Sequence, residues 1–327
     1  MYCPSTGNLS IVGVSFSGRV PTWGTPVSLL STAYSQPYVL AGIIKLGDNK
    51  GAIAYTDRNP SSPFQANQYI RAFTISGNTL TVGAQVTIDT STSGTFRFIE
   101  KVNTDTFCVG IKVPAASPAN AVYGCSVSGT TVTAGTPDRS GGYSNTFSGA
   151  VFVEAGKFVI NWGTTDSGTG WQVFTQSGTT LTAGTASTTS SSTNVVVNGH
   201  AYSNTQVYMN GRALTLSGTT ITGVATTNPW MGGLPQNGSN FGQADQYFES
   251  PTSGVFFGYF NGMAQMGRQL ANEAVTSPTT NVMLSLGWGG DTSVTWKSSN
   301  KFGNTTMILW GRYETTNNLA VTFVDLL

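Results

Sequence analysis

The sequence predicts an all-β protein, built as a six-bladed β-propeller with four antiparallel strands per blade. Three observations support this prediction. One eight-residue phrase recurs along the chain, segments with a two-residue apolar period precede each copy, and no segment has a convincing helical period. Repeated units made only of short strands are typical of propeller blades.

The recurring phrase is a Ser-Gly turn followed by alternating threonine and aliphatic residues. Its four clear copies are Ser76–Gly83, Ser128–Gly135, Ser177–Gly184 and Ser217–Thr222. Glycine supplies the positive φ that a tight hairpin turn requires, and β-branched residues suit the pleated strand that follows. Weaker copies occur at Phe16–Gly24, after a predicted strand over Leu9–Phe16, and at Gly289–Trp296.

Six blades account for all 327 residues. Their expected extents are 31–90, 91–138, 139–188, 189–228, 229–302, and 303–327 together with 7–30. In the second blade, the strands before the hairpin are expected at Thr95–Val102 and Thr106–Val113. In the third blade they are expected at Ala150–Glu154 and Lys157–Trp162.

The two chain ends are expected to complete one blade together. The C-terminus offers two strands, Thr305–Tyr313 and Asn318–Leu327, with no hairpin after them, whereas the N-terminus begins with a hairpin. A ring closed in this way leaves no open edge between blades. Seven blades are the alternative, if residues 226–303 contain an additional one.

The fourth strand of each blade is expected to form its outer edge. The segments in this place carry no charged residue: Thr79–Val86, Thr130–Thr136, Thr179–Thr188 and Thr219–Thr226. Exposed edges are usually protected from strand addition by lysine or proline. Two explanations stay open: short length and high twist protect the edges, or a neighbouring subunit covers them.

Composition indicates a neutral surface over a real core. Charged residues make up 9% of the chain, against about 25% in an average soluble domain, while 39% are hydrophobic. A surface of hydroxyls and amides suits a subunit packed against others. The net charge of +1, with scattered basic residues, argues against nucleic-acid binding.

No membrane insertion or secretion is expected. No apolar run approaches the length of about 20 residues that spans a bilayer, and the N-terminus lacks the features of a signal peptide. The chain is therefore predicted to be made in the cytoplasm of its host cell.

Three cysteines are present, and their spacing fits no metal motif. Cys108 and Cys125 fall on consecutive predicted strands, and a register shift of one residue would place them side by side. Two interpretations stay open: a disulfide or thiol pair, or two buried free thiols that act as small apolar side chains.

The longest loop is expected at Thr226–Gln246. It carries an apolar set among Gly, Asn and Gln residues: Trp230, Met231, Leu234 and Phe241. Long loops without their own structure are often functional. This set is a candidate contact with a glycan or a partner protein, and the alternative is an aromatic plug over one end of the propeller.

Little in the sequence points to catalysis, and no catalytic residue, metal site or cofactor is predicted. His200 is the single histidine, which excludes sites built from paired histidines. The 14 carboxylates are scattered, so no pair for glycoside hydrolysis stands out.

Thr164–Trp171 resembles the Asp-box of sialidases and other six-bladed propellers, although Gly170 replaces the expected threonine. The resemblance implies a structural turn with a buried tryptophan and carries no catalytic residue. The recurring Ser-Gly-Thr-Thr phrase resembles repeats in bacteriophage virion proteins, including tail- and fibre-associated propellers. That resemblance implies a non-enzymatic virion component that contacts other virion proteins in multiple copies, or a host-surface glycan or protein.

Two rival functions come from other classes. A lectin propeller would repeat one aromatic anchor at the same place in each blade, and the seven tryptophans do not fall at equivalent positions. A glycosidase with a sialidase-like fold would need an arginine triad, which is not evident in the sequence.

Overall fold

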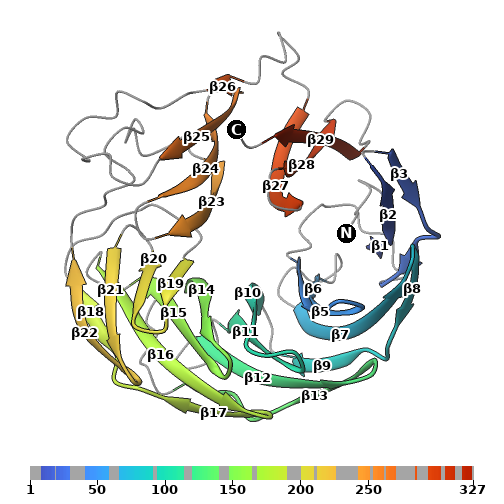
Figure 1. The fold of residues 1–327 in the computed structure, drawn as a ribbon. Helices are drawn as coiled ribbons and strands as arrows, with labels where there is room; N and C mark the ends of the chain where they lie inside the picture. The colour runs from blue at the N-terminus through green and yellow to red at the C-terminus, as the bar shows by residue number, and fades with distance from the viewer. Residues whose placement is uncertain are drawn as a thin grey trace. The chain divides into compact units, whose positions relative to one another are not determined.

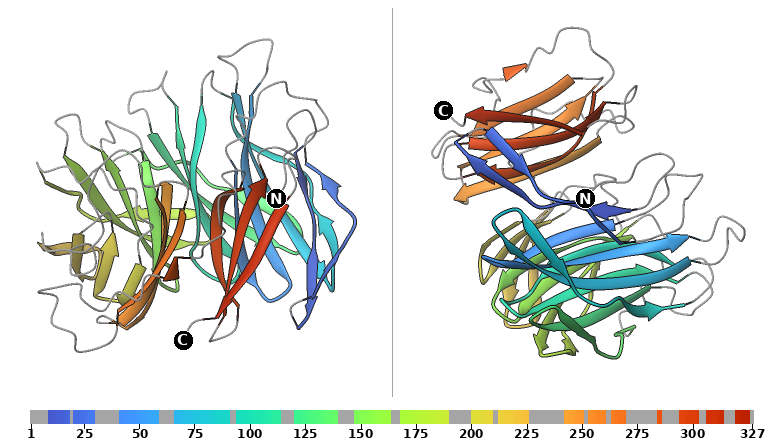
Figure 2. Two further views of the ribbon diagram at one scale, coloured as in Figure 1. Left: turned by 90° about the horizontal axis from the view of Figure 1, so that it is seen from above. Right: turned by 90° about the vertical axis from the view of Figure 1, so that its right-hand side faces the viewer.

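The computed structural model contains only β-strands in the residues that it describes, and all its sheets are antiparallel (Figures 1 and 2). The described residues are 9–18, 20–29, 41–58, 66–90, 94–113, 120–139, 147–163, 168–189, 200–209, 212–225, 242–250, 253–260, 263–269, 284–285, 294–302, 306–313 and 319–325. The all-β prediction is confirmed for this part of the chain.

The strands form successive small sheets. The N-terminal strands are β1 (Ser10–Ile11), β2 (Val14–Ser17), β3 (Val20–Trp23) and β4 (Val27–Ser28). The next sheet contains β5 (Ala41–Gly47), β6 (Lys50–Arg58), β7 (Ala66–Ser76), β8 (Thr79–Val82) and β9 (Val86–Asp89). It is followed by the sheet of β10 (Thr95–Lys101), β11 (Thr106–Lys112), β12 (Asn120–Ser128) and β13 (Thr131–Ala134).

In the remaining sheets, most neighbouring strands again follow each other in sequence. One contains β14 (Phe147–Glu154), β15 (Lys157–Gly163), β16 (Thr169–Ser177), β17 (Thr180–Ala183) and β18 (Ser187–Thr189). Another contains β19 (His200–Ser203), β20 (Gln206–Met209), β21 (Arg212–Ser217) and β22 (Thr220–Ala225). The last two contain β23 (Gly242–Ser250), β24 (Ser253–Phe260), β25 (Met263–Gln269) and β26 (Leu284–Ser285), and then β27 (Val294–Phe302), β28 (Thr306–Tyr313) and β29 (Leu319–Asp325).

The chain divides into two compact units. The first contains residues 1–192 and the β21–β22 turn, Leu216–Ile221, and the second contains Thr193–Thr215 and Thr222–Leu327. Within the first unit, the first strand of one sheet lies beside the first strand of the next: β10 contacts both β5 and β14 (Figure 1). Consecutive sheets of this unit therefore pack directly against each other.

The predicted hairpin turns are confirmed. Five of the six expected glycines have φ between 57° and 59°: Gly18, Gly77, Gly129, Gly178 and Gly218. The sixth, Gly290, lies outside the described residues. The turns at Gly77, Gly129, Gly178 and Gly218 join the third strand of a sheet to its fourth, as in the pairing of Ser76 with Thr79, whereas the Gly18 turn joins the two strands β2 and β3.

The structure corrects three predicted strands. Leu9–Phe16 is not one strand, because it is interrupted at Val12–Gly13 between β1 and β2. The outer strand expected at Thr79–Val86 breaks after Val82, and β8 and β9 then pair separately with β7. The outer strand expected at Thr179–Thr188 breaks in the same way into β17 and β18.

The assignment at the chain ends also differs from the prediction. β27, expected in the fifth blade, pairs with β28 and so belongs to the last sheet. In the described part of the chain, β1 pairs with β4 and β2 with β3, while β27, β28 and β29 form their own sheet. The N-terminal hairpin of β2 and β3 is present as expected.

The core of the first unit lies between sheets. One cluster joins β6, β7, β11 and β12 and includes Ile70, Phe107 and Ile111, all fully buried. A second joins β10, β11, β15 and β16 and includes Phe158 and Phe174, whose rings stack 5.3 Å apart. Because both faces of the sheet of β10 to β13 pack in the core, β11 and β12 are buried along almost their whole length.

Candidate interaction surface

The outer strands end at a set of glycines with a common role, which we call the receiving glycines: Gly24, Gly83, Gly135 and Gly184. Gly83, Gly135 and Gly184 each donate the backbone N–H to a carbonyl on the neighbouring third strand, for example Gly83 to Ala72 at 2.9 Å and Gly184 to Val173 at 2.8 Å, and Gly24 donates to the Gly13 carbonyl just before β2. These hydrogen bonds fix the point at which each outer strand bends away.

The next sheet places its hairpin turn on each receiving glycine. The turn residue that follows the positive-φ glycine points its carbonyl oxygen at the receiving glycine of the preceding sheet: Asn78 at Gly24, Thr130 at Gly83, Thr179 at Gly135 and Thr219 at Gly184. A Cβ at any of these four glycines would overlap that oxygen. The approach of two backbones therefore requires glycine.

The fourth copy of the phrase departs from this pattern. Its eighth residue is Val224, where the other copies have glycine, and β22 runs without a break over Thr220–Ala225. The following sheet joins its third and fourth strands through residues 270–283 and so has no two-residue hairpin there. An outer strand therefore bends at the glycine against which the hairpin turn of the next sheet packs.

The outer strands expose a series of threonines. In β8, β13, β17 and β22 the exposed positions alternate with partly or fully buried aliphatic residues: Thr79, Thr81, Thr131, Thr133, Thr180, Thr182, Thr220 and Thr222. None of these strands carries a charge. The surface predicted from the sequence is therefore present, but each strand is only four to six residues long.

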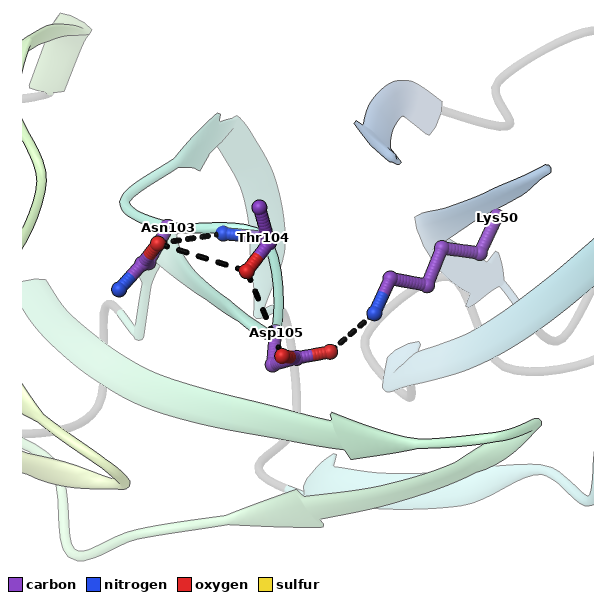
Figure 3. A network of polar contacts seen from close by, with 4 residues as sticks. All are labelled: Lys50, Asn103, Thr104 and Asp105. Carbon is purple, nitrogen blue, oxygen red and sulfur yellow. Dashed lines mark hydrogen bonds and ion pairs between the residues drawn. The ribbon is translucent and has the colours of Figure 1, made fainter. Parts of the chain in front are cut away.

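A polar network ties two sheets of the first unit together (Figure 3). Lys50, at the start of β6, forms an ion pair with Asp105 in the β10–β11 turn. Asn103 accepts a hydrogen bond from the Thr104 N–H at 2.7 Å, and Thr104 Oγ1 lies 3.3 Å from Asp105 Oδ2. The hydrogen bond from Lys50 lowers the pKa of Asp105.

Gln176 makes a second connection between sheets. Its side chain is buried, and Nε2 donates to the carbonyls of Phe107 at 3.2 Å and Cys125 at 3.0 Å. The same group reaches the Gly178 carbonyl in its own turn at 2.8 Å. Residues equivalent to Gln176 in the other three clear copies are Ile75, Val127 and Leu216, which are all aliphatic, so this contact is particular to one sheet pair among them.

The two cysteines in the described residues, Cys108 and Cys125, are free and buried. Cys108 pairs with Gly124 and Cys125 with Phe107, so the thiols project from opposite faces of the β11–β12 pair. They accordingly belong to different core clusters. Burial raises the pKa of both thiols well above the usual value, which keeps them protonated and unreactive.

Glu100 is the most perturbed carboxyl group among the described residues. Burial raises its pKa to about 8, and the hydrogen bond that it accepts from the Lys101 N–H, at 3.1 Å, opposes this only in part. Glu100 pairs with Cys108 across β10 and β11. It lies against an apolar sheet interface and has no ion-pair partner in the described residues, so ionising it in the folded state is costly.

Glu100→Gln is therefore expected to stabilise the protein as the pH rises. In the folded state the carboxyl group titrates near pH 8, and in the unfolded state near pH 4.3. The wild type consequently loses stability between these values, whereas the amide does not titrate. We expect equal stability near pH 4 and a gain of about 1–3 kcal/mol at pH 9, measured by urea unfolding. A pH-independent difference would contradict this.

Other sequence predictions fall partly outside the described residues. The candidate contact set Trp230, Met231, Leu234 and Phe241 lies outside them, and β23 begins at Gly242, within the loop that was expected to reach Gln246. His200 is the first residue of β19 and pairs with Tyr208.

Within the described ranges, no group of three or more His, Cys, Asp or Glu side chains is placed to hold a metal ion. Among the same residues there is no helix with the length and hydropathy needed to cross a membrane.

The buried tryptophan implied by the Asp-box resemblance is present. Trp171 is completely buried in β16. Gly170, which departs from the Asp-box pattern, pairs with Trp162, and any side chain there would overlap the Trp162 indole ring. The departure thus has a steric reason.

Comparison with known proteins adds no identification. No protein-family model matches the chain, and no curated protein matches it.

Proposed function

We propose that the chain is a six-bladed β-propeller that serves as a non-enzymatic structural component of a bacteriophage particle. In this proposal it contacts other virion proteins in multiple copies, in the tail, in a fibre or on the particle surface, and it takes part in recognition of the host surface. The observation that supports it best is the set of neutral, threonine-bearing outer strands on sheets that pack in series.

The contacts between sheets favour the propeller. Four successive hairpin turns sit on four receiving glycines, always from one sheet to the preceding one. A contact with a fixed direction, repeated between equivalent sheets, generates either a ring or an open array. In the proposed ring, the turn at Gly18 would complete the series, and the two chain ends would share a blade.

Trp162 and Trp171 are unsuited to sugar binding, whereas Trp23 is 44% exposed. Trp162 and Trp171 lie in neighbouring strands of one sheet and are at most 2% exposed, so neither can stack on a glycan. Their positions have no tryptophan in the adjacent sheet, where Val122 is equivalent to Trp171.

Lysine on the outer strands tests the assembly function. Thr131→Lys, Thr180→Lys and Thr220→Lys each place a charge on an exposed position, and folding should be unaffected. If neighbouring subunits cover this surface, at least one variant should lose about tenfold or more of its incorporation into particles, because a buried unpaired charge is costly. Asn49→Lys, exposed in the β5–β6 turn, is the matched control.

Normal incorporation of all three variants would contradict assembly through the outer strands. A glycan array and a panel of chromogenic glycosides address the rival functions. Binding of a defined glycan would instead support a lectin, and release of chromophore would support a glycosidase.

A further inference from the structure

The edge strand β10 contains a β-bulge at Arg97. Its pairing with β11 shifts between Phe96 and Phe98, so that Phe96 lies opposite Ile111 and Phe98 opposite Gly110. Phe96 consequently packs in the first core cluster and Phe98 in the second, where it contacts Phe147 edge-on. Bulges of this kind redirect a side chain and are frequent next to binding sites.

Arg97 has an unsatisfied hydrogen-bond donor. Its Nε is buried and has no acceptor, and no described acidic side chain forms an ion pair with it. Two residues earlier on the strand, Thr95 Oγ1 is also buried and has no partner. Both residues remain partly exposed, so solvent reaches the site.

Leaving a charged donor desolvated and unpaired is costly, and native proteins rarely do so without a ligand or an ordered water. Burial also lowers the pKa of Arg97, in keeping with this cost. The Nε edge of a guanidinium, together with one Nη, matches the two oxygens of a carboxylate or phosphate. The hydroxyl of Thr95 offers a further donor on the same strand.

We propose that Arg97 and Thr95 form a binding site for a small oxyanion, a carboxylate or phosphate group, at the bulge of β10. Such a group occurs in acidic sugars and in phosphorylated surface polymers, and this inference does not depend on the proposed assembly function. A single guanidinium with one hydroxyl is expected to bind with a Kd of about 1 mM.

Thermal unfolding of the full chain tests this site with sodium glucuronate, inorganic phosphate and sodium chloride at equal ionic strength. At about twentyfold excess over Kd, glucuronate, phosphate or both should raise the Tm by about 2–5 °C relative to chloride. The two oxyanion arms distinguish a carboxylate from a phosphate source. Arg97→Gln should abolish the shift.

Arg71→Gln is the control for loss of a buried unpaired Nε, because Arg71 lies on β7 at a position without a bulge and without an unpaired hydroxyl two residues earlier. This variant should retain the shift. Without added anion, Arg97→Gln should unfold at the wild-type Tm or above it, since no protein partner is lost. Equal shifts with chloride, a shift that survives in Arg97→Gln, or a lower Tm of Arg97→Gln without anion would each overturn the proposal.

Discussion

Gly83→Ala is expected to lower the free energy of unfolding by about 2–3 kcal/mol. The new Cβ would overlap the Thr130 carbonyl oxygen, which belongs to the backbone of the next sheet and cannot rotate away. Relief requires that the two sheets move apart or that the hydrogen bond from Gly83 to Ala72 breaks. Urea unfolding of the full chain, followed by tryptophan fluorescence, measures the change.

Two other glycines provide matched controls. Gly223→Ala, in the unbroken strand β22, would bring its Cβ only into ordinary contact with Thr215, at 3.5 Å, and should change stability by less than about 1 kcal/mol. Gly77→Ala has open space but a φ of 59°, and should cost about 1 kcal/mol through backbone strain alone. Equal losses at Gly83 and Gly223 would contradict the steric explanation.

Trp171→Ala is expected to cost about 3–5 kcal/mol, the usual range for removing a fully buried aromatic side chain. Trp171→Phe should lower the free energy of unfolding by less, under about 1.5 kcal/mol. The indole Nε1 is buried without an acceptor among the described residues, so phenylalanine loses volume but no hydrogen bond.

Thermal and urea unfolding of both variants, with Phe174→Leu as a control for loss of apolar volume in the same strand, would measure this difference. If Trp171→Phe were as damaging as Trp171→Ala, the indole N–H would have an important partner. That result would contradict the burial of the Trp171 indole N–H without an acceptor.

Local structure in this chain could be predicted from the sequence because it depends on neighbouring residues. Ser-Gly between alternating segments specifies a hairpin wherever it occurs, and the five described turns all have the expected glycine conformation. The strands of the second and third blades were also predicted to within a few residues, for example β11 at Thr106–Lys112. Their apolar composition and short turns leave few alternatives.

The breaks in the outer strands could not be predicted, because their cause lies in another sheet. The eighth residue of the repeated phrase is glycine because a side chain there would overlap a backbone carbonyl oxygen about 50 residues later in the chain, as with Gly83 and Thr130. The sequence shows that Gly184 and Val224 differ, but the steric reason for glycine at position 184 is evident only from the position of the Thr219 carbonyl.

The sequence and the tertiary structure determined different features of this protein. The sequence by itself established an all-β chain, its hairpins and its uncharged outer strands, since these follow from local periodicity and composition. Only the tertiary structure placed Cys108 and Cys125 on opposite faces, joined Lys50 to Asp105, and left Arg97 without an acceptor. Such features depend on strand register and on contacts between sheets, where a shift of one residue reverses the face of every side chain.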